Sequence, residues 1–152
     1  MDYKVKVIDP QELIPPLLKL LEDTPTVPLL ISGSSMSPFL VHGRDTVYLS
    51  KITYPPRRGD MILYRRDNGK FVLHRVYETG DTYTMVGDAQ TLLERGIRPD
   101  QLLARVTSVC RKGKMLQKGS FWWDFFEKTW IRMVAARPAV RSAYSQLKNL
   151  ID

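Results

Sequence analysis

The chain has 152 residues, of which 43% are hydrophobic and 26% are charged, and this composition is typical of one globular domain rather than of a disordered chain. The single cysteine, Cys110, excludes an internal disulfide and lies far in sequence from any histidine, so we expect no structural zinc and no cofactor. The formal charge of +7 favours an anionic partner, such as an acidic peptide, a nucleic acid or an anionic membrane face.

The N-terminal part of the chain lacks the pattern of a secretory signal or a membrane anchor. Acidic residues and prolines interrupt residues 1–22, whereas a signal peptide needs an unbroken apolar stretch. The nearly uncharged run over 24–43 contains prolines and several serines, which do not suit a spanning helix. We therefore expect a cytoplasmic protein without a transmembrane anchor.

The central part of the chain has the pattern of a β domain. A short helix is expected over 11–22, where leucines supply an apolar face, and a strand over 27–31 runs into the turn Ser32-Gly33-Ser34-Ser35. Further strands are expected over 46–49, 61–64, 71–77, 83–86 and 102–109. Short strands separated by turn residues predict a mainly β fold, either an antiparallel sheet or a partly open barrel.

Aromatic and basic residues dominate the chain from Ser120 onward. On a helix, one face would carry Trp122, Phe126, Trp130 and Met133, opposite the charged side chains, and Pro138 is expected to break or kink the helix. The aromatic face could pack against the β domain or a second subunit, or it could lie on an anionic bilayer. We expect a β domain over 1–119 and an amphipathic helical appendage over 120–152, with peripheral contact to the inner membrane face through 120–151.

Ser35 is the first candidate for chemistry. A serine becomes a nucleophile only when a base removes its proton and a turn presents its hydroxyl to substrate, and Ser35 lies where a strand gives way to a turn. The chain has two histidines that could act as the base, His42 and His74. Taken alone, each histidine is typical of a surface or core position.

Four short motifs strengthen the case for Ser35 and His74. In chain order they are Gly33-Ser34-Ser35-Met36-Ser37-Pro38, Gly59-Asp60-Met61-Ile62, Leu73-His74-Arg75-Val76 and Gly87-Asp88. Together they resemble the conserved boxes of the signal-peptidase and LexA-type serine peptidases. This resemblance implies the catalytic β domain of that clan, with Ser35 as the nucleophile. Bacterial signal peptidases and LexA use a lysine base at the third motif, whereas the archaeal and endoplasmic-reticulum branch uses histidine, so His74 resembles the histidine branch.

The resemblance also implies roles for neighbouring residues. A histidine with a pKa near its reference value of about 6.5 can accept the serine proton at neutral pH, but it must be held in the correct tautomer. Asp88 is the predicted orienting carboxylate, which gives a Ser35–His74–Asp88 triad, and Asp60 is the alternative. His42 is predicted to lie on the surface.

The oxyanion hole is expected to begin with the backbone N–H of Ser35. Some family members add a serine hydroxyl two residues before the nucleophile, where this chain has Gly33, so Ser32 or Ser34 would have to replace it. The predicted oxyanion and substrate-binding residues are Ser32, Gly33, Ser34 and Met36.

The sequence thus predicts a serine endopeptidase that cleaves a peptide or leader substrate, and the absence of a predicted anchor favours a cytoplasmic leader peptidase. One alternative is a self-cleaving LexA-like regulator, but few residues precede Ser35 and they contain no Ala-Gly or Cys-Gly bond. The other is an inactive binding module that uses a basic patch at 57, 58, 65 and 66. Because aromatic residues do not interleave this patch, we expect no specific nucleic-acid binding.

Overall fold

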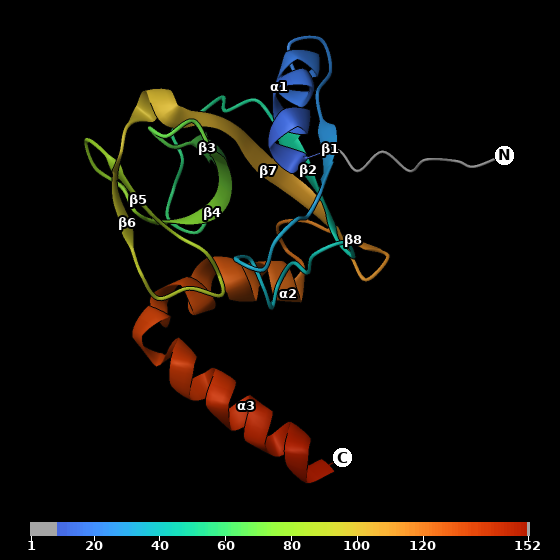
Figure 1. The fold of residues 1–152 in the computed structure, drawn as a ribbon, viewed down its shortest axis with the longest axis vertical. Helices are drawn as coiled ribbons and strands as arrows, with labels where there is room; N and C mark the ends of the chain where they lie inside the picture. The colour runs from blue at the N-terminus through green and yellow to red at the C-terminus, as the bar shows by residue number, and fades with distance from the viewer. Residues whose placement is uncertain (1–8, 152) are drawn as a thin grey trace, which may run out of the picture.

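The computed structural model describes residues 9–151, and one antiparallel sheet makes up most of the fold (Figure 1). Its strands are β1 (Val27–Leu30), β2 (Thr46–Ser50), β3 (Met61–Arg65), β4 (Phe71–Glu78), β5 (Tyr83–Val86), β6 (Glu94–Ile97), β7 (Leu102–Arg111) and β8 (Lys114–Leu116). The order across the sheet is β1-β2-β7-β3-β4-β5-β6, and β8 pairs with β7. The mainly β fold and the antiparallel sheet are therefore confirmed, and residues 1–8 and 152 of the two predicted domains lie outside the described part.

The burial pattern follows from each strand's place in the sheet. In β1, Val27 and Leu29 are buried while the residues between them are exposed, as expected for a strand with one face on the core. β3 lies between β7 and β4, and Met61 to Tyr64 are all buried, so both of its faces are covered. Position 74 on β4 pairs with Ile62 of this fully covered strand.

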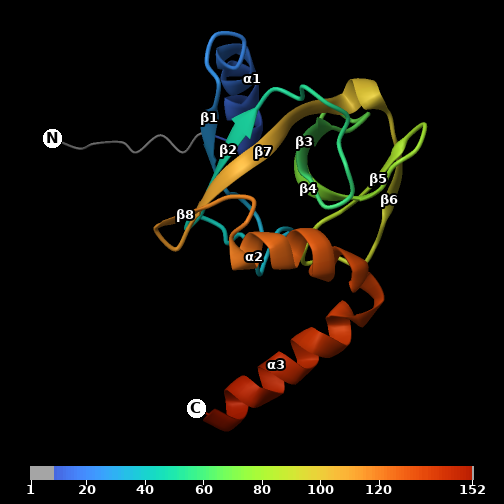
Figure 2. The same cartoon turned by 180° about the vertical axis from the view of Figure 1, so that it is seen from behind.

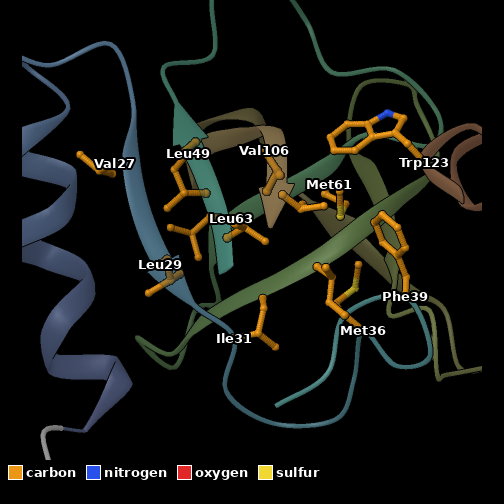
Figure 3. Packing of buried hydrophobic residues seen from close by; sticks show 14 of the residues in the cluster. Val27, Leu29, Ile31, Met36, Phe39, Leu49, Met61, Leu63, Val106 and Trp123 are labelled. Carbon is orange, nitrogen blue, oxygen red and sulfur yellow. The ribbon is translucent and has the colours of Figure 1, made fainter. Parts of the chain in front are cut away.

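The turn after β1 contributes directly to the hydrophobic core. Met36 and Phe39 are buried there together with Met61 of β3 and Trp123 of the C-terminal segment (Figure 3). The Phe39 and Trp123 rings meet edge to face, with centroids 6.4 Å apart. The buried side chains of Met36 and Phe39, which follow Ser35 in the chain, therefore anchor its turn to the core.

The N-terminal helix α1 (Pro10–Leu20) confirms the predicted helix to within two residues at either end. Asp9 caps it by accepting a hydrogen bond from the Gln11 N–H, and Pro10 occupies the first turn, where no N–H is needed. The Gln11 side chain also bonds both backbone groups of Phe71, which ties the helix to β4.

The C-terminal segment is helical but irregular, and it first packs on the sheet. It comprises α2 (Phe121–Asp124), a π-helical turn η2 (Phe125–Thr129), the 3-10 turns η3 (Trp130–Arg132) and η4 (Val134–Ala136), and α3 (Arg137–Ile151). The face that meets the core carries Trp123, Phe126 and Trp130, whereas Trp122 is 46% exposed. The predicted aromatic face is therefore wrong by one residue at its start.

Helix α3 leaves the body of the protein. It projects from the sheet in both views (Figures 1 and 2). Pro138 lies in its first turn, so the break predicted at this proline coincides with the start of α3 as a second helical piece. None of the helices within residues 9–151 is both long and apolar enough to cross a membrane.

Candidate active site

The turn that carries Ser35 is held by bonds within the segment between β1 and β2. Gly33 has φ +83°, a conformation that suits glycine, and its N–H donates to Nδ1 of His42 at 2.9 Å. The Gly43 N–H closes the segment by donating to the Ile31 carbonyl at 2.9 Å. His42 is exposed, as predicted, but it also holds the turn that presents Ser35.

Ser35 and His74 line the same cavity, although they are far apart in the sequence. The cavity has a volume of about 280 Å³, and its polar lining consists of Ser32, Ser35, Arg66, His74 and Gln90. Within residues 9–151 no hydrogen bond joins the Ser35 hydroxyl to His74. Such bonds are often long in a substrate-free enzyme and tighten when substrate is bound.

The imidazole of His74 is held by a chain of side chains from two other strands. Its Nδ1 lies 3.1 Å from the Tyr64 hydroxyl, and that hydroxyl donates to Glu94 Oε2 at 3.1 Å. Glu94 is paired with Arg66 at 2.7 Å. Sequence reasoning missed Tyr64 and Glu94, because no local motif connects them with His74.

The environment of His74 favours its neutral form. Burial, assisted by the positive charge of Arg66, lowers the pKa of His74 from 6.5 to about 4, although Glu94 acts in the opposite direction. The imidazole is therefore uncharged at neutral pH and can accept a proton. Burial and the neighbouring Glu94 raise the pKa of Tyr64, so the phenol keeps its proton.

Glu94 is ionised despite being partly buried. Burial alone would raise its pKa, but hydrogen bonds from Arg66 and Tyr64 outweigh that effect and leave the pKa of Glu94 below its ordinary value. The carboxylate therefore acts only as an acceptor in the chain that ends at His74.

Asp88 lies with Arg75 rather than with His74. Both of its carboxylate oxygens accept hydrogen bonds from Arg75 at 2.9 Å, and both side chains are fully buried. Neighbouring residues of a strand point to opposite faces, so the partner of Arg75 cannot also reach His74. Within residues 9–151 neither Asp88 nor the alternative Asp60 makes the predicted contact with His74. Asp60 instead accepts from the Arg57 N–H and from Arg105.

The Gly87-Asp88 motif supports the backbone of the turn that carries Ser35. The Ala89 N–H donates to the Ser35 carbonyl at 2.9 Å, and a methyl group at Gly87 would lie 2.5 Å from the same oxygen. Arg75 also donates to the Gly59 carbonyl, so it joins the second motif to the fourth. These motif residues therefore bring the segments of the site together.

The C-terminal segment braces this loop from behind. Trp130 Nε1 donates to the Asp88 carbonyl at 2.8 Å, and the buried Arg137 donates to the carbonyls of Gly87 and Gln90 at 2.8 Å. The segment from Trp123 to Arg137 is thus packed on the β domain, and of the appendage predicted from Ser120 onward only the part of α3 after Arg137 projects from it.

The predicted oxyanion and substrate-binding residues lie in two neighbouring places. Ser32, Gly33 and Met36 line the cavity with His74, and Met36 is also part of the hydrophobic core. Ser34 lines a neighbouring hollow of about 400 Å³ that Ser35 also borders. The backbone N–H of Ser35 has no acceptor within the described part of the chain, so it is available to an oxyanion.

Comparisons with known proteins do not assign a family to this site. No family model matches the chain, and neither a curated protein nor a solved structure matches it. Within residues 9–151 no group of three or more His, Cys, Asp or Glu side chains is arranged to hold a metal ion.

Proposed function

We propose that this chain is a serine hydrolase that forms an acyl-enzyme, and more particularly an endopeptidase of the signal-peptidase type that cleaves a peptide or leader substrate. One observation carries the proposal: a turn-borne serine and a neutral, buried histidine line one cavity. This is the minimum pair needed to activate a hydroxyl. The resemblance of the four motifs supplies the substrate class.

The chemistry follows from the two side chains. The neutral imidazole of His74 takes the proton of the Ser35 hydroxyl as Oγ attacks the peptide carbonyl. The imidazolium then gives that proton to the departing amine, which leaves an ester on Ser35. A water molecule, deprotonated by the same imidazole, hydrolyses the ester and restores the free hydroxyl.

Two features support stabilisation of the developing oxyanion. The Ser35 N–H has no competing acceptor in residues 9–151, and Ser32 lies in the same cavity. A preformed backbone donor of this kind accounts for a large part of the rate enhancement in acyl-transfer enzymes. In this proposal Ser32 takes the place of the hydroxyl that Gly33 lacks.

Helix α3 supports a peripheral membrane location for the enzyme. Its apolar face is exposed and consists of Val140, Tyr144, Leu147, Leu150 and Ile151. Between residues 128 and 151 the sequence contains lysine and arginine but no acidic residue. An exposed apolar face beside basic side chains suits the surface of an anionic bilayer, so we propose that α3 docks there.

An active-site label tests the proposed chemistry directly. We expect a fluorophosphonate probe to add once to wild-type protein, as seen by intact mass, and not to add to Ser35→Ala. Labelling of His74→Ala should be slower by at least about a hundredfold, since general-base catalysis contributes 10²–10⁴-fold. Ser145→Ala, which removes an exposed hydroxyl on α3, is the control and should label normally. Equal labelling of Ser35→Ala and wild-type protein would overturn the proposal in favour of a binding module.

A peptide library then tests the substrate class. We expect internal peptide bonds to be cut by wild-type protein and left intact by Ser35→Ala. A change in the mass of purified wild-type protein, absent in Ser35→Ala, would point to self-cleavage instead.

A further inference from the structure

We infer that Tyr64 and Glu94 are positioning residues that keep the proton of neutral His74 on Nδ1 and leave Nε2 free to accept another. The catalytic meaning of this arrangement rests on the proposed function, but the tautomer itself does not. The side chains concerned come from three strands, β3, β4 and β6.

The assignment follows from counting protons along the chain. The Tyr64 hydroxyl has one proton to donate, and it lies 3.1 Å from both His74 Nδ1 and Glu94 Oε2. Glu94 is ionised and can only accept, so the phenolic proton goes to Glu94. The Tyr64 oxygen then accepts, and Nδ1 of His74 must be the donor.

The opposite arrangement is less favourable. If Tyr64 donated to Nδ1, the carboxylate of Glu94 and the phenolic oxygen would face each other at 3.1 Å with no proton between them. That arrangement would also replace a charge-assisted bond with a neutral one, and charge-assisted bonds are roughly twice as strong. Burial of Tyr64 increases the difference, because water cannot compensate the lost bond.

Arg66 sets the charge state on which this arrangement depends. Its guanidinium makes three hydrogen bonds to the Glu94 carboxylate, between 2.7 and 3.2 Å, and keeps the carboxylate ionised. The same charge lowers the pKa of His74. Arg66 therefore favours the neutral form of His74 and the ionised form of Glu94. The ionised Glu94, acting through Tyr64, in turn selects the tautomer of His74.

The curl of the sheet makes the arrangement possible. β4 and β5 separate β3 from β6 in the strand order, yet Tyr64 on β3 bonds Glu94 on β6. The strands must therefore wrap around far enough for β6 to return to β3. As a result, a phenol stands between the carboxylate and the imidazole, where a classical triad has direct contact.

The tautomer of His74 can be measured without any substrate. The protein contains two histidines, so labelling histidine with nitrogen-15 gives two sets of ring signals in long-range proton–nitrogen correlation spectra, and His42→Gln assigns them. We expect wild-type His74 to carry its proton on Nδ1 at neutral pH. Tyr64→Phe and Glu94→Gln should both shift the population toward Nε2–H, and Glu78→Gln, which changes an exposed glutamate, should not.

Labelling of Ser35 shows whether the tautomer matters for chemistry. Tyr64→Phe and Glu94→Gln should label more slowly than wild type, by up to the roughly 10²–10⁴-fold that general-base catalysis contributes. Because Glu94→Gln keeps the side-chain shape, it decides the question if Tyr64→Phe fails to fold.

The two proposals fail in different ways. A wild-type His74 with its proton on Nε2, or a tautomer that neither variant changes, would overturn the inference while leaving Ser35 chemistry intact. If His74 shows the expected tautomer but the probe never labels Ser35, the proposed function is wrong and the Tyr64–Glu94 assignment stands.

Discussion

Gly87 lies directly behind Ser35, because a methyl group on its Cα would come within 2.5 Å of the Ser35 carbonyl oxygen. The contacting atom belongs to the backbone, so it cannot move without shifting the turn. The neighbouring Ala89 N–H bonds the same oxygen at 2.9 Å. The loop after β5 and the turn that carries Ser35 therefore fit together only if residue 87 has no side chain.

Gly87→Ala should therefore both destabilise the protein and slow the labelling of Ser35. We expect a loss of about 1–3 kcal/mol in the free energy of unfolding, the usual cost of overpacking, measured by urea denaturation. Gly80→Ala is the matched control, since the nearest atom to an added methyl there is 3.6 Å away. Equal effects of the two substitutions would show that the turn has room to move.

The burial of His74 predicts an unusual pH dependence. With a pKa of about 4 in place of 6.5, His74 should keep labelling of Ser35 nearly constant from pH 7 to about pH 5, with loss only near pH 4. Arg66→Gln removes a charge that lowers this pKa, so its activity loss should begin at higher pH. A wild-type acid limb centred near 6.5 would contradict the burial of His74 in solution.

The same shift has a consequence for stability. Between pH 6.5 and 4 the unfolded chain binds a proton at residue 74 that the folded chain does not bind, so the free energy of unfolding should fall as the pH falls through this window. The stabilising contribution is complete above pH 6.5. His74→Gln should show a weaker fall over the same range, as measured by denaturant unfolding at each pH.

Asp88 should behave as a structural residue. Asp88→Asn leaves the buried guanidinium of Arg75 without its charged partner, and breaking a buried pair of this kind costs about 3–5 kcal/mol of stability. The protein that remains folded should keep the acid limb of wild type, because Asp88 does not contact His74. Asp81→Asn, at an exposed turn, is the control and should change neither property. A shifted acid limb with unchanged stability would restore the predicted triad.

Some of the fold could be predicted because it depends on local pattern. Strands with apolar residues and turn residues at their ends, such as those at 46–50 and 61–65, are visible in the sequence. β6 could not be found this way, since Glu94-Arg95-Gly96-Ile97 has one apolar residue and a glycine. It forms through pairing with β5, and pairing across the sheet leaves no local signal.

The candidate site, like the fold, could be predicted only in part from the sequence. The motif resemblance pointed to Ser35 and His74 as candidates, and both line one cavity. The partner of His74 could not be identified, because the choice between Asp88 and Tyr64 depends on which face of β4 each one meets. The motif does not show which face is which, because His74 and Arg75 are adjacent in sequence but their side chains point to opposite faces of β4.

Helix α3 gives the last prediction, which concerns the membrane. We expect wild-type protein to sediment with vesicles of phosphatidylserine and phosphatidylcholine, to do so less as salt rises, and not to bind phosphatidylcholine alone. Replacing Tyr144, Leu147 and Ile151 with serine should abolish sedimentation, because all three are exposed apolar residues of one helix face. The double variant R132Q/K148Q should weaken it roughly thirtyfold, at about 1 kcal/mol per cation. Ser142→Ala with Gln146→Ala alters the polar face and is the control. If the wild-type protein stays in solution and instead dimerises through this face, α3 binds a second copy and the membrane proposal is wrong.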